Sequence, residues 1–197
     1  MSLVPAFEIG IWNAWIFALA GLFFHAVPPL LAAQFNANMK KKFSEKAPAN
    51  IYLNKTEKRI DTVTIIILIL LLIYTVFLPL QLGTPWFYIG LAIFLLGVIV
   101  YMTSVVPWAN TPVDKPVTTG LYRYSRHPIY LTIVVQLIGV GIASASWLFL
   151  LLTVVLIILF NFSAIPEERG CLEKYGDTYR EYMDRTPRWI GLPKSSA

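Results

Sequence analysis

The feature that most constrains the fold is a long uncharged run near the carboxyl end: residues 131–166 contain no Asp, Glu, Lys or Arg. About 20 apolar residues let a helix cross the hydrocarbon core of a bilayer, so the apolar stretch 128–165 is too long for one span and suits two. Backbone polar groups in lipid must be paired within the segment, which favours helices. We therefore expect a helical hairpin. Its turn is predicted in the neighbourhood of Gly139, Gly141, Ser144, Ser146 and Trp147.

Three further apolar stretches precede the hairpin, at residues 11–33, 62–82 and 86–106. The chain of 197 residues is 57% hydrophobic and only 14% charged, whereas about a quarter of the residues in a soluble domain are charged. Pro28 and Pro29 should kink or end the first stretch, because each ring removes a backbone donor. These patterns predict an all-α integral membrane protein with about five transmembrane helices.

The basic residues are confined to three segments, which together hold all 16 Lys and Arg. The positive-inside rule places such segments on the cytoplasmic side. We therefore expect a multi-pass protein with its amino terminus outside and its carboxyl terminus in the cytoplasm. The segments are residues 40–59, 115–126 and 169–194. One membrane domain is predicted over 1–197, with three spanning helices and a basic cytoplasmic loop in 1–106 and the chemistry in 107–197.

Several classes of protein are disfavoured. The basic residues lie beside apolar stretches, which indicates anionic lipid headgroups as partners rather than nucleic acid. The one cysteine, Cys171, excludes an internal disulfide and a multi-cysteine metal site, and no metal is expected. A cleaved signal peptide is the alternative for the first apolar stretch, but it is long for that role and no basic region precedes it.

Two polar segments flank the hairpin, at residues 120–130 and 167–182. Titratable groups at both mouths of one hairpin can converge on a single site at the membrane surface. Residues 167–186 have helical spacing and predict an amphipathic cytoplasmic helix that covers this mouth. Its apolar stripe comprises Leu172, Tyr175, Tyr179, Tyr182 and Met183.

His127 begins the predicted fourth helix, and Pro128 suits the first helical turn. The free backbone donors and positive dipole end there favour an anion, to which Arg123 and Arg126 add charge. The carboxylate of an amino-acid-like cofactor is one such anion. The alternative is structural: the arginines reach lipid phosphates and His127 caps the helix.

Glu167 and Glu168 stand where the fifth helix is predicted to end, against the preference of the helix dipole. They suit a cationic ligand, or donors such as ribose hydroxyls or an amine. In the alternative, Pro166 ends the helix and the two acids begin the next one.

Aromatic residues cluster near the same mouth. Tyr122, Tyr124, Tyr130 and Trp108 fit an interfacial aromatic belt, but an adenine ring or a sulfonium cation would also use such faces. His25, near the proline pair, is expected to be structural, because the prolines leave backbone carbonyls free to satisfy it.

Both polar segments carry a resemblance to a known family. Thr119-Gly120-Leu121-Tyr122 and the following Arg-His-Pro-Ile-Tyr at 126–130 resemble the first signature of the isoprenylcysteine carboxyl methyltransferase family, whose wider group includes membrane phospholipid methyltransferases. The second signature of the family is resembled by a later set of residues: Glu167-Glu168, Leu172, Tyr175-Gly176, Tyr179, Tyr182 and Pro187-Arg188. The resemblance covers about residues 105–192.

The resemblance implies an integral membrane methyltransferase that uses S-adenosylmethionine, releases S-adenosylhomocysteine and acts on a lipophilic acceptor entering from the bilayer. The implied cofactor contacts, on the cytoplasmic face, are Lys115, Pro116, Val117, Leu121, Tyr122, His127, Pro128, Tyr130 and Glu167. If the acceptor is an amine, a proton must leave, and Glu168 or His127 would be the catalytic base. If the acceptor is a carboxylate, a water-excluding pocket favours methyl transfer without a base.

The acceptor and the reaction class have alternatives. An isoprenylcysteine-like carboxylate is the first expectation and a phospholipid amine the second. The prenylcysteine enzymes carry a substrate-contacting arginine at a position that falls here around Ser163, and no arginine occurs between residues 127 and 168. An NADPH-dependent membrane sterol reductase, with a similar Arg-His-Pro-x-Tyr element, is a third alternative. A non-enzymatic transporter subunit is disfavoured, since it would place ionisable residues inside the bundle.

Overall fold

The computed structural model describes residues 7–37, 40–41 and 54–194, and this part of the chain is helical without a named strand. Most of the predicted basic loop between the first two helices lies outside the described residues. The elements are α1 (Trp15–Phe35), α3 (Lys55–Thr75), α4 (Pro85–Asn110), the 3-10 helix η2 (Gly120–Arg123), α5 (Pro128–Ala143), α6 (Trp147–Tyr175) and α7 (Asp177–Arg185).

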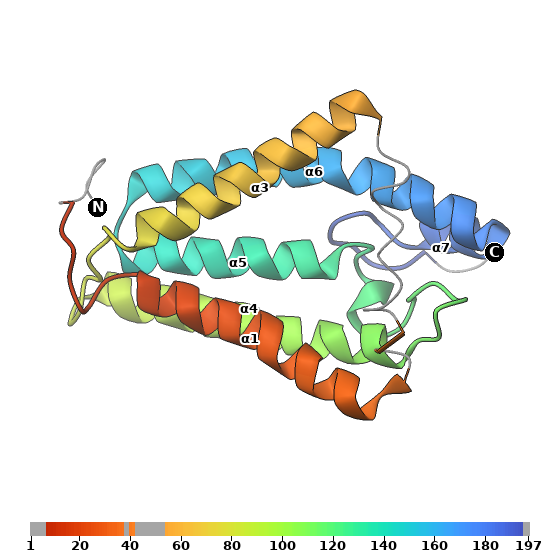
Figure 1. Cartoon of the computed structure of the whole chain (residues 1–197), viewed down its shortest axis with the longest axis horizontal. Helices are drawn as coiled ribbons and strands as arrows, with labels where there is room; N and C mark the ends of the chain where they lie inside the picture. The colour runs from red at the N-terminus through yellow and green to blue at the C-terminus, as the bar shows by residue number, and fades with distance from the viewer. Residues whose placement is uncertain (1–6, 38–39, 42–53, 195–197) are drawn as a thin grey trace.

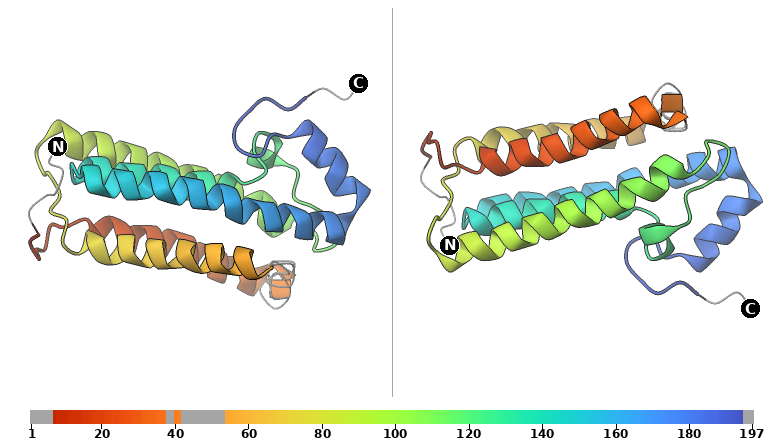
Figure 2. Two further views of the ribbon diagram at one scale, coloured as in Figure 1. Left: turned by 90° about the horizontal axis from the view of Figure 1, so that it is seen from above. Right: turned by 90° about the horizontal axis from the view of Figure 1, so that it is seen from below.

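The five long helices run side by side, with η2, α7 and the end of the chain at one end of the bundle (Figure 1). Seen from above and below, α1 and α3 form one layer and α4, α5 and α6 form the other (Figure 2). Within the second layer, α4 and α5 pack closely, because Gly90 and Gly139 face each other's backbones. A Cβ atom on Gly90 would lie 2.3 Å from the backbone nitrogen of Ala143.

The predicted hairpin is α5 and α6, and its turn falls at residues 144–146 as expected. Ser146 caps α6 by accepting a hydrogen bond from the backbone N–H of Phe149. Three of the helices, α1, α4 and α6, are long and apolar enough to span a membrane. α5 has 16 residues, which is about 24 Å, and α3 begins with charged residues. The count of five spans therefore stays a prediction.

Helix boundaries differ from the prediction in several places. α3 begins earlier than residue 62, because Asn54 and Glu57 form a capping box at its amino end, and it ends at Thr75. Pro28 and Pro29 lie inside α1 and do not end it.

The prediction of one helix over 167–186 is wrong, and so is the alternative in which Pro166 ends a helix. α6 continues through Pro166 to Tyr175, which places Glu167 and Glu168 about two turns before its end. Gly176, with φ of 57°, then separates α6 from the short α7. A backbone with positive φ is readily adopted by glycine, so the break comes where the residue permits it.

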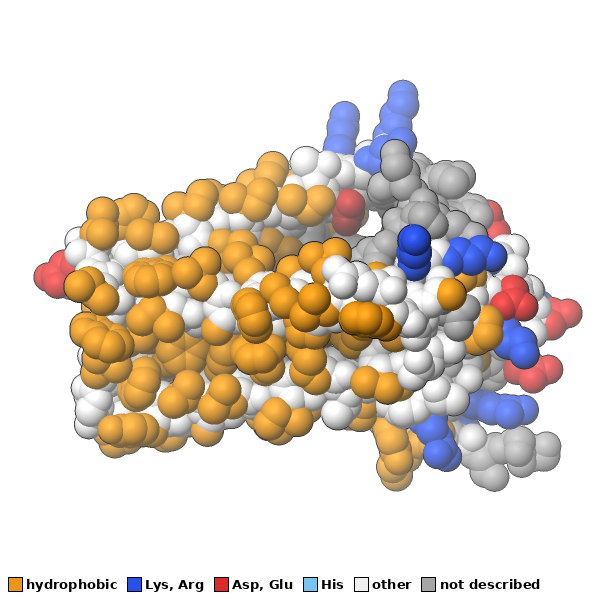
Figure 3. Space-filling model, turned by 60° about the horizontal axis from the view of Figure 1, so that its bottom comes forward, with side chains coloured by type: hydrophobic (Ala, Val, Ile, Leu, Met, Phe, Trp, Pro, Cys, Tyr) orange, Lys and Arg blue, Asp and Glu red, His pale blue; other side chains and the backbone are white. Residues whose placement is uncertain are grey.

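Hydrophobic side chains cover most of the face of the bundle drawn in Figure 3, and charged side chains gather at the end that carries α7. This distribution suits a body in lipid and an end in water. We conclude that the protein is a membrane protein whose polar residues are concentrated at one mouth.

Candidate functional site

A cavity of about 380 Å³ lies at the charged end of the bundle, within the range of about 300–1,000 Å³ typical of small-molecule sites. Its wall is contributed by α4, the segment before η2, η2 itself, the start of α5, the end of α6, and α7. The lining residues are Trp108, Pro116, Val117, Tyr122, Arg126, His127, Pro128, Ile129, Tyr130, Glu167, Cys171, Tyr175, Tyr179 and Tyr182.

The start of α5 is held by the segment that follows α7. The backbone N–H of Arg126 donates to the carbonyl of Pro187 at 3.1 Å. The hydroxyl of Ser125 donates to the carbonyl of Arg188 at 3.2 Å and accepts from the backbone N–H of His127 at 3.1 Å. These contacts bring the two polar segments of the sequence together and fix the position of the His127 side chain.

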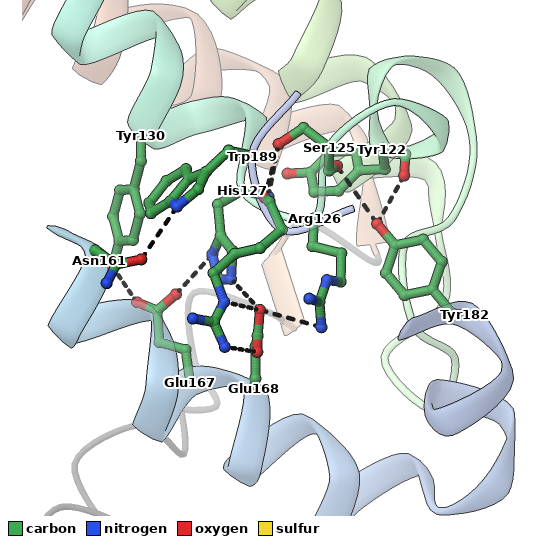
Figure 4. Close-up of polar contacts among 11 residues, drawn as sticks. Tyr122, Ser125, Arg126, His127, Tyr130, Asn161, Glu167, Glu168, Tyr182 and Trp189 are labelled. Atoms are coloured by element: carbon green, nitrogen blue, oxygen red, sulfur yellow. Dashed lines mark hydrogen bonds and ion pairs between the residues drawn. The ribbon is translucent and has the colours of Figure 1, made fainter. Parts of the chain in front are cut away.

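Glu168 is the centre of a buried charge network (Figure 4). Only 3% of the residue is exposed. Arg188 donates to it through both Nε and Nη2, at 2.9 and 2.7 Å, and His127 Nε2 lies 3.1 Å from Oε1. Arg126 Nη1 completes the group, 3.2 Å from the same oxygen. A carboxylate with so many cationic partners is stabilised in its charged form, which makes it a poor proton acceptor.

Glu167, on the same turn of α6, faces the cavity. Its carboxylate accepts a hydrogen bond from the Tyr130 hydroxyl, and Oε2 lies 3.5 Å from His127 Nδ1. Its side chain is 40% exposed, so it remains accessible to a ligand.

The His127 imidazole therefore lies between two carboxylates. Burial alone lowers the pKa of His127, but the hydrogen bonds and negative charges of Glu167 and Glu168 outweigh burial and raise the pKa above its ordinary value. A ring that holds its proton in this way is an ion-pair partner rather than a free base.

Arg126 has unused hydrogen-bonding capacity at the cavity wall. Its side chain is 11% exposed, and within the described residues its Nε and Nη1 atoms are buried without a hydrogen bond. The contact from Nη1 to Glu168 is thus an ion pair and not a well-directed hydrogen bond. Buried polar groups are nearly always satisfied, so Arg126 suits an anionic group of a ligand.

Aromatic rings form the opposite wall. Tyr122, Tyr179 and Tyr182 are each less than a tenth exposed. The Tyr182 hydroxyl donates to the carbonyl of Tyr122 at 2.7 Å, which joins α7 to η2. Burial raises the pKa of Tyr182, so the hydroxyl stays protonated. On the α5 side, the Tyr130 ring stacks on Phe160 at 4.6 Å between centroids.

The structure brings most of the expected cofactor contacts to this one cavity. Two of them are not among its lining residues: Lys115 is exposed in a turn, and Leu121 lies beside Tyr122 in η2, where adjacent residues face different sides. The expected contacts that line the cavity are Pro116, Val117, Tyr122, His127, Pro128, Tyr130 and Glu167.

Sequence reasoning missed other members of the site. Arg188 was part of the second signature, but nothing in the spacing indicated its pairing with Glu168. Cys171 also lines the cavity, and the sequence had only shown that it has no cysteine partner. Tyr179 and Tyr182 were identified only as an apolar stripe, and that helical stripe is the signal from which their place in the wall follows.

Comparison with known proteins identified one family whose model matches this chain. The family model described as "Protein of unknown function (DUF1295)" matches residues 30–186, which is most of the chain. The chain belongs to this family. No curated protein sequence matches the DUF1295 protein, and the family description assigns no activity. The match includes both the hairpin and the two polar segments that form the cavity.

A pH dependence follows from His127 in this DUF1295 protein. Because its folded pKa lies above the unfolded value of about 6.5, its contribution to stability is full below that pH and is lost as pH rises through the folded pKa. The melting temperature of the wild type should therefore exceed that of His127→Gln most at about pH 6, and by less as the buffer becomes alkaline. A difference that stays constant with pH would contradict the protonated bridge. Circular dichroism melts in detergent provide the measurement.

Proposed function

We propose that the protein is an S-adenosylmethionine-dependent methyltransferase that acts on a lipophilic acceptor. The observation that carries the proposal is the buried guanidinium of Arg126, whose Nε and Nη1 have no hydrogen bond within the described residues, in the same aromatic cavity as the accessible carboxylate of Glu167. An amino-acid-like cofactor has both an anionic carboxylate and a cationic ammonium, and this cavity offers a partner for each. The DUF1295 family is also related to methyltransferase-like membrane proteins.

The residues present fit that cofactor. Arg126 would bind the carboxylate by charge-assisted hydrogen bonds. Glu167 would accept from ammonium or ribose donors, and the tyrosine rings provide faces for adenine and for a sulfonium. When bound, S-adenosylmethionine supplies a methyl group on a positively charged sulfur. We place the site on the cytoplasmic face, because the basic segments share this end of the bundle.

The protein's contribution is then mainly positioning. Glu168 was, with His127, a candidate base for an amine acceptor, but the network around it leaves that carboxylate fully engaged, and we assign it the role of orienting His127 and Arg126. Since His127 holds its proton between two acids, neither residue is a free base. This favours an acceptor that need not lose a proton, such as a carboxylate, for which exclusion of water and alignment suffice. An isoprenylcysteine-like carboxylate meets this requirement better than a phospholipid amine.

A nicotinamide-dependent reduction is the competing activity, since the family is related to membrane steroid reductases as well. NADPH carries several phosphate charges, which proteins bind with clusters of Arg and Lys. The described lining of this cavity holds one Arg and one His beside an acid. That balance suits a ligand of small net charge better than a dinucleotide.

The test is calorimetric binding of S-adenosylhomocysteine to detergent-purified protein, with NADPH as the second ligand. We expect the former to bind and Glu167→Gln to weaken it by about tenfold or more, as for a lost charged hydrogen bond. Glu173→Gln is the matched control, because Glu173 is an exposed acid of the same helix away from the cavity. Binding of NADPH alone would replace the proposal with a reductase.

A further inference from the structure

A second cavity lies deeper in the bundle, between the two layers of helices. Its volume is about 240 Å³. α1, α3, α4, α5 and α6 all contribute to its wall, which is almost entirely carbon. The residues that define it in the argument below are Gly21, Leu22, His25, Phe94, Ile133 and Gln136.

This cavity is separate from the first one. The two cavities share no lining residue. Along α5 the last residue of the first lining is Tyr130 and the first residue of the second is Ile133, about 4.5 Å apart along the axis. Leu22 lines the second cavity and is 51% exposed, so this part of the wall also faces the outer surface of the bundle.

Two polar side chains stand out in this apolar wall. His25 Nε2 and Gln136 Nε2 lie 3.1 Å apart. The His25 ring also stacks on Tyr101, with 3.8 Å between centroids. Polar groups at membrane depth are costly and usually functional.

The position of His25 follows from the proline pair. Pro29 has no N–H to donate to the carbonyl of His25 one turn earlier. The Tyr101 hydroxyl donates to that carbonyl instead, at 3.1 Å. This bond satisfies the backbone of α1, but it does not explain the two polar side chains that meet beside the cavity.

The Gln136 amide has capacity left for a ligand. It is 6% exposed, and the contact with His25 is its one hydrogen bond within the described residues. A primary amide has two donors and an acceptor oxygen, so a donor and an acceptor remain. A hydroxyl group both donates and accepts, and it matches that pair.

We propose that this cavity is a binding site for a neutral lipid-soluble alcohol, whose hydroxyl bonds to the Gln136 amide beside His25 and whose hydrocarbon part packs against the apolar wall. The occupant carries no charge, because no Asp, Glu, Lys or Arg lines the cavity and its polar side chains are those of Gln136, His25 and Thr75. The volume of the cavity lies below the range of about 300–1,000 Å³ of drug-sized sites. It fits a short alcohol or the hydroxyl end of a longer one. This inference does not rest on methyl transfer.

The test uses two photoreactive probes, a diazirine derivative of octanol and the matching derivative of octane, on the full-length protein in lipid nanodiscs. Labelled residues are located by mass spectrometry. We expect saturable labelling by the alcohol at α1 and α5 residues of the cavity wall. Gln136→Leu should reduce labelling by the alcohol about three- to tenfold, the effect of one neutral hydrogen bond, and leave the alkane unaffected.

Two further variants keep the result interpretable. A Cβ atom at Gly21 has room, with its nearest neighbour Gln136 Oε1 at 3.5 Å, so Gly21→Leu should fill the cavity and abolish labelling by both probes there. Gln81→Leu makes the same chemical change outside the cavity and should change nothing. Labelling that is unsaturable, that persists in Gly21→Leu, or that is equal for alcohol and alkane would overturn the proposal.

Discussion

Replacement of Glu168 by Gln is expected to lower the free energy of unfolding by about 3–5 kcal/mol, the cost of removing one partner from a buried charge network. The change leaves the guanidinium groups of Arg126 and Arg188 near each other without the carboxylate that lies 2.7–3.2 Å from both. Native proteins are stable by about 5–15 kcal/mol, so the loss is a large share of the total. Denaturant unfolding in mixed micelles, followed by circular dichroism, measures it.

Glu57→Gln provides the matched control. Glu57 also accepts two hydrogen bonds from one arginine, Arg169, but that arginine is 41% exposed. Solvent screens such a pair, and its removal should change stability little. Equal effects of the two substitutions would show that burial of Glu168 does not set the strength of its network.

Replacement of Arg126 by Met is expected to weaken S-adenosylhomocysteine binding by about ten- to a hundredfold, because a hydrogen bond to a charged group contributes about 1.5–3 kcal/mol. The loss of affinity should depend on the carboxylate of the ligand, because that is the group that Arg126 is proposed to bind. 5′-Methylthioadenosine lacks the amino-acid part, so its affinity should be the same for the wild type and Arg126→Met. Isothermal titration with both ligands measures the two effects on one preparation.

Arg123→Met is the control for charge alone, since Arg123 is exposed on η2 and does not line the cavity. It should leave both affinities unchanged. If Arg126→Met weakens both ligands equally, the residue supports the shape of the cavity and does not bind the carboxylate.

Much of the fold was predictable from the placement of charge. The uncharged run 131–166 and the small residues at its middle led to the hairpin and to a turn within residues 139–147, and the structure has the turn at 144–146. Boundaries were harder to predict. Pro166 resembles a helix stop, yet neighbouring turns of a long helix can accommodate it. Tyr175 and Tyr179 are spaced as in one continuous helix, so the spacing of the apolar residues did not indicate the break at Gly176.

The site residues that belong to the two motifs were predictable. The contacts made by the segment after α7, which folds back against the start of α5, were not. His127, Tyr130 and Glu167 were expected together because their motifs bracket the hairpin. The pairing of Arg188 with Glu168 depends on the path of the segment after α7, which spacing along the sequence does not encode. His25 was expected to be structural, and its contact with Gln136, 111 residues away, depends on how α1 packs in the bundle, which the sequence does not show.

The segment after α7 also sets an order of assembly. Its carbonyls receive the Arg126 N–H and the Ser125 hydroxyl, and its Arg188 neutralises a glutamate buried in α6. The ribosome makes this segment after every helix of the bundle, so the spanning helices reach the bilayer while the mouth is still unfinished. In a nascent chain that stops before Arg188, the buried carboxylate of Glu168 would lack the two hydrogen bonds that Arg188 donates to it. The pocket at the mouth is thus complete only once the chain has been made through Arg188, after the helices that surround it.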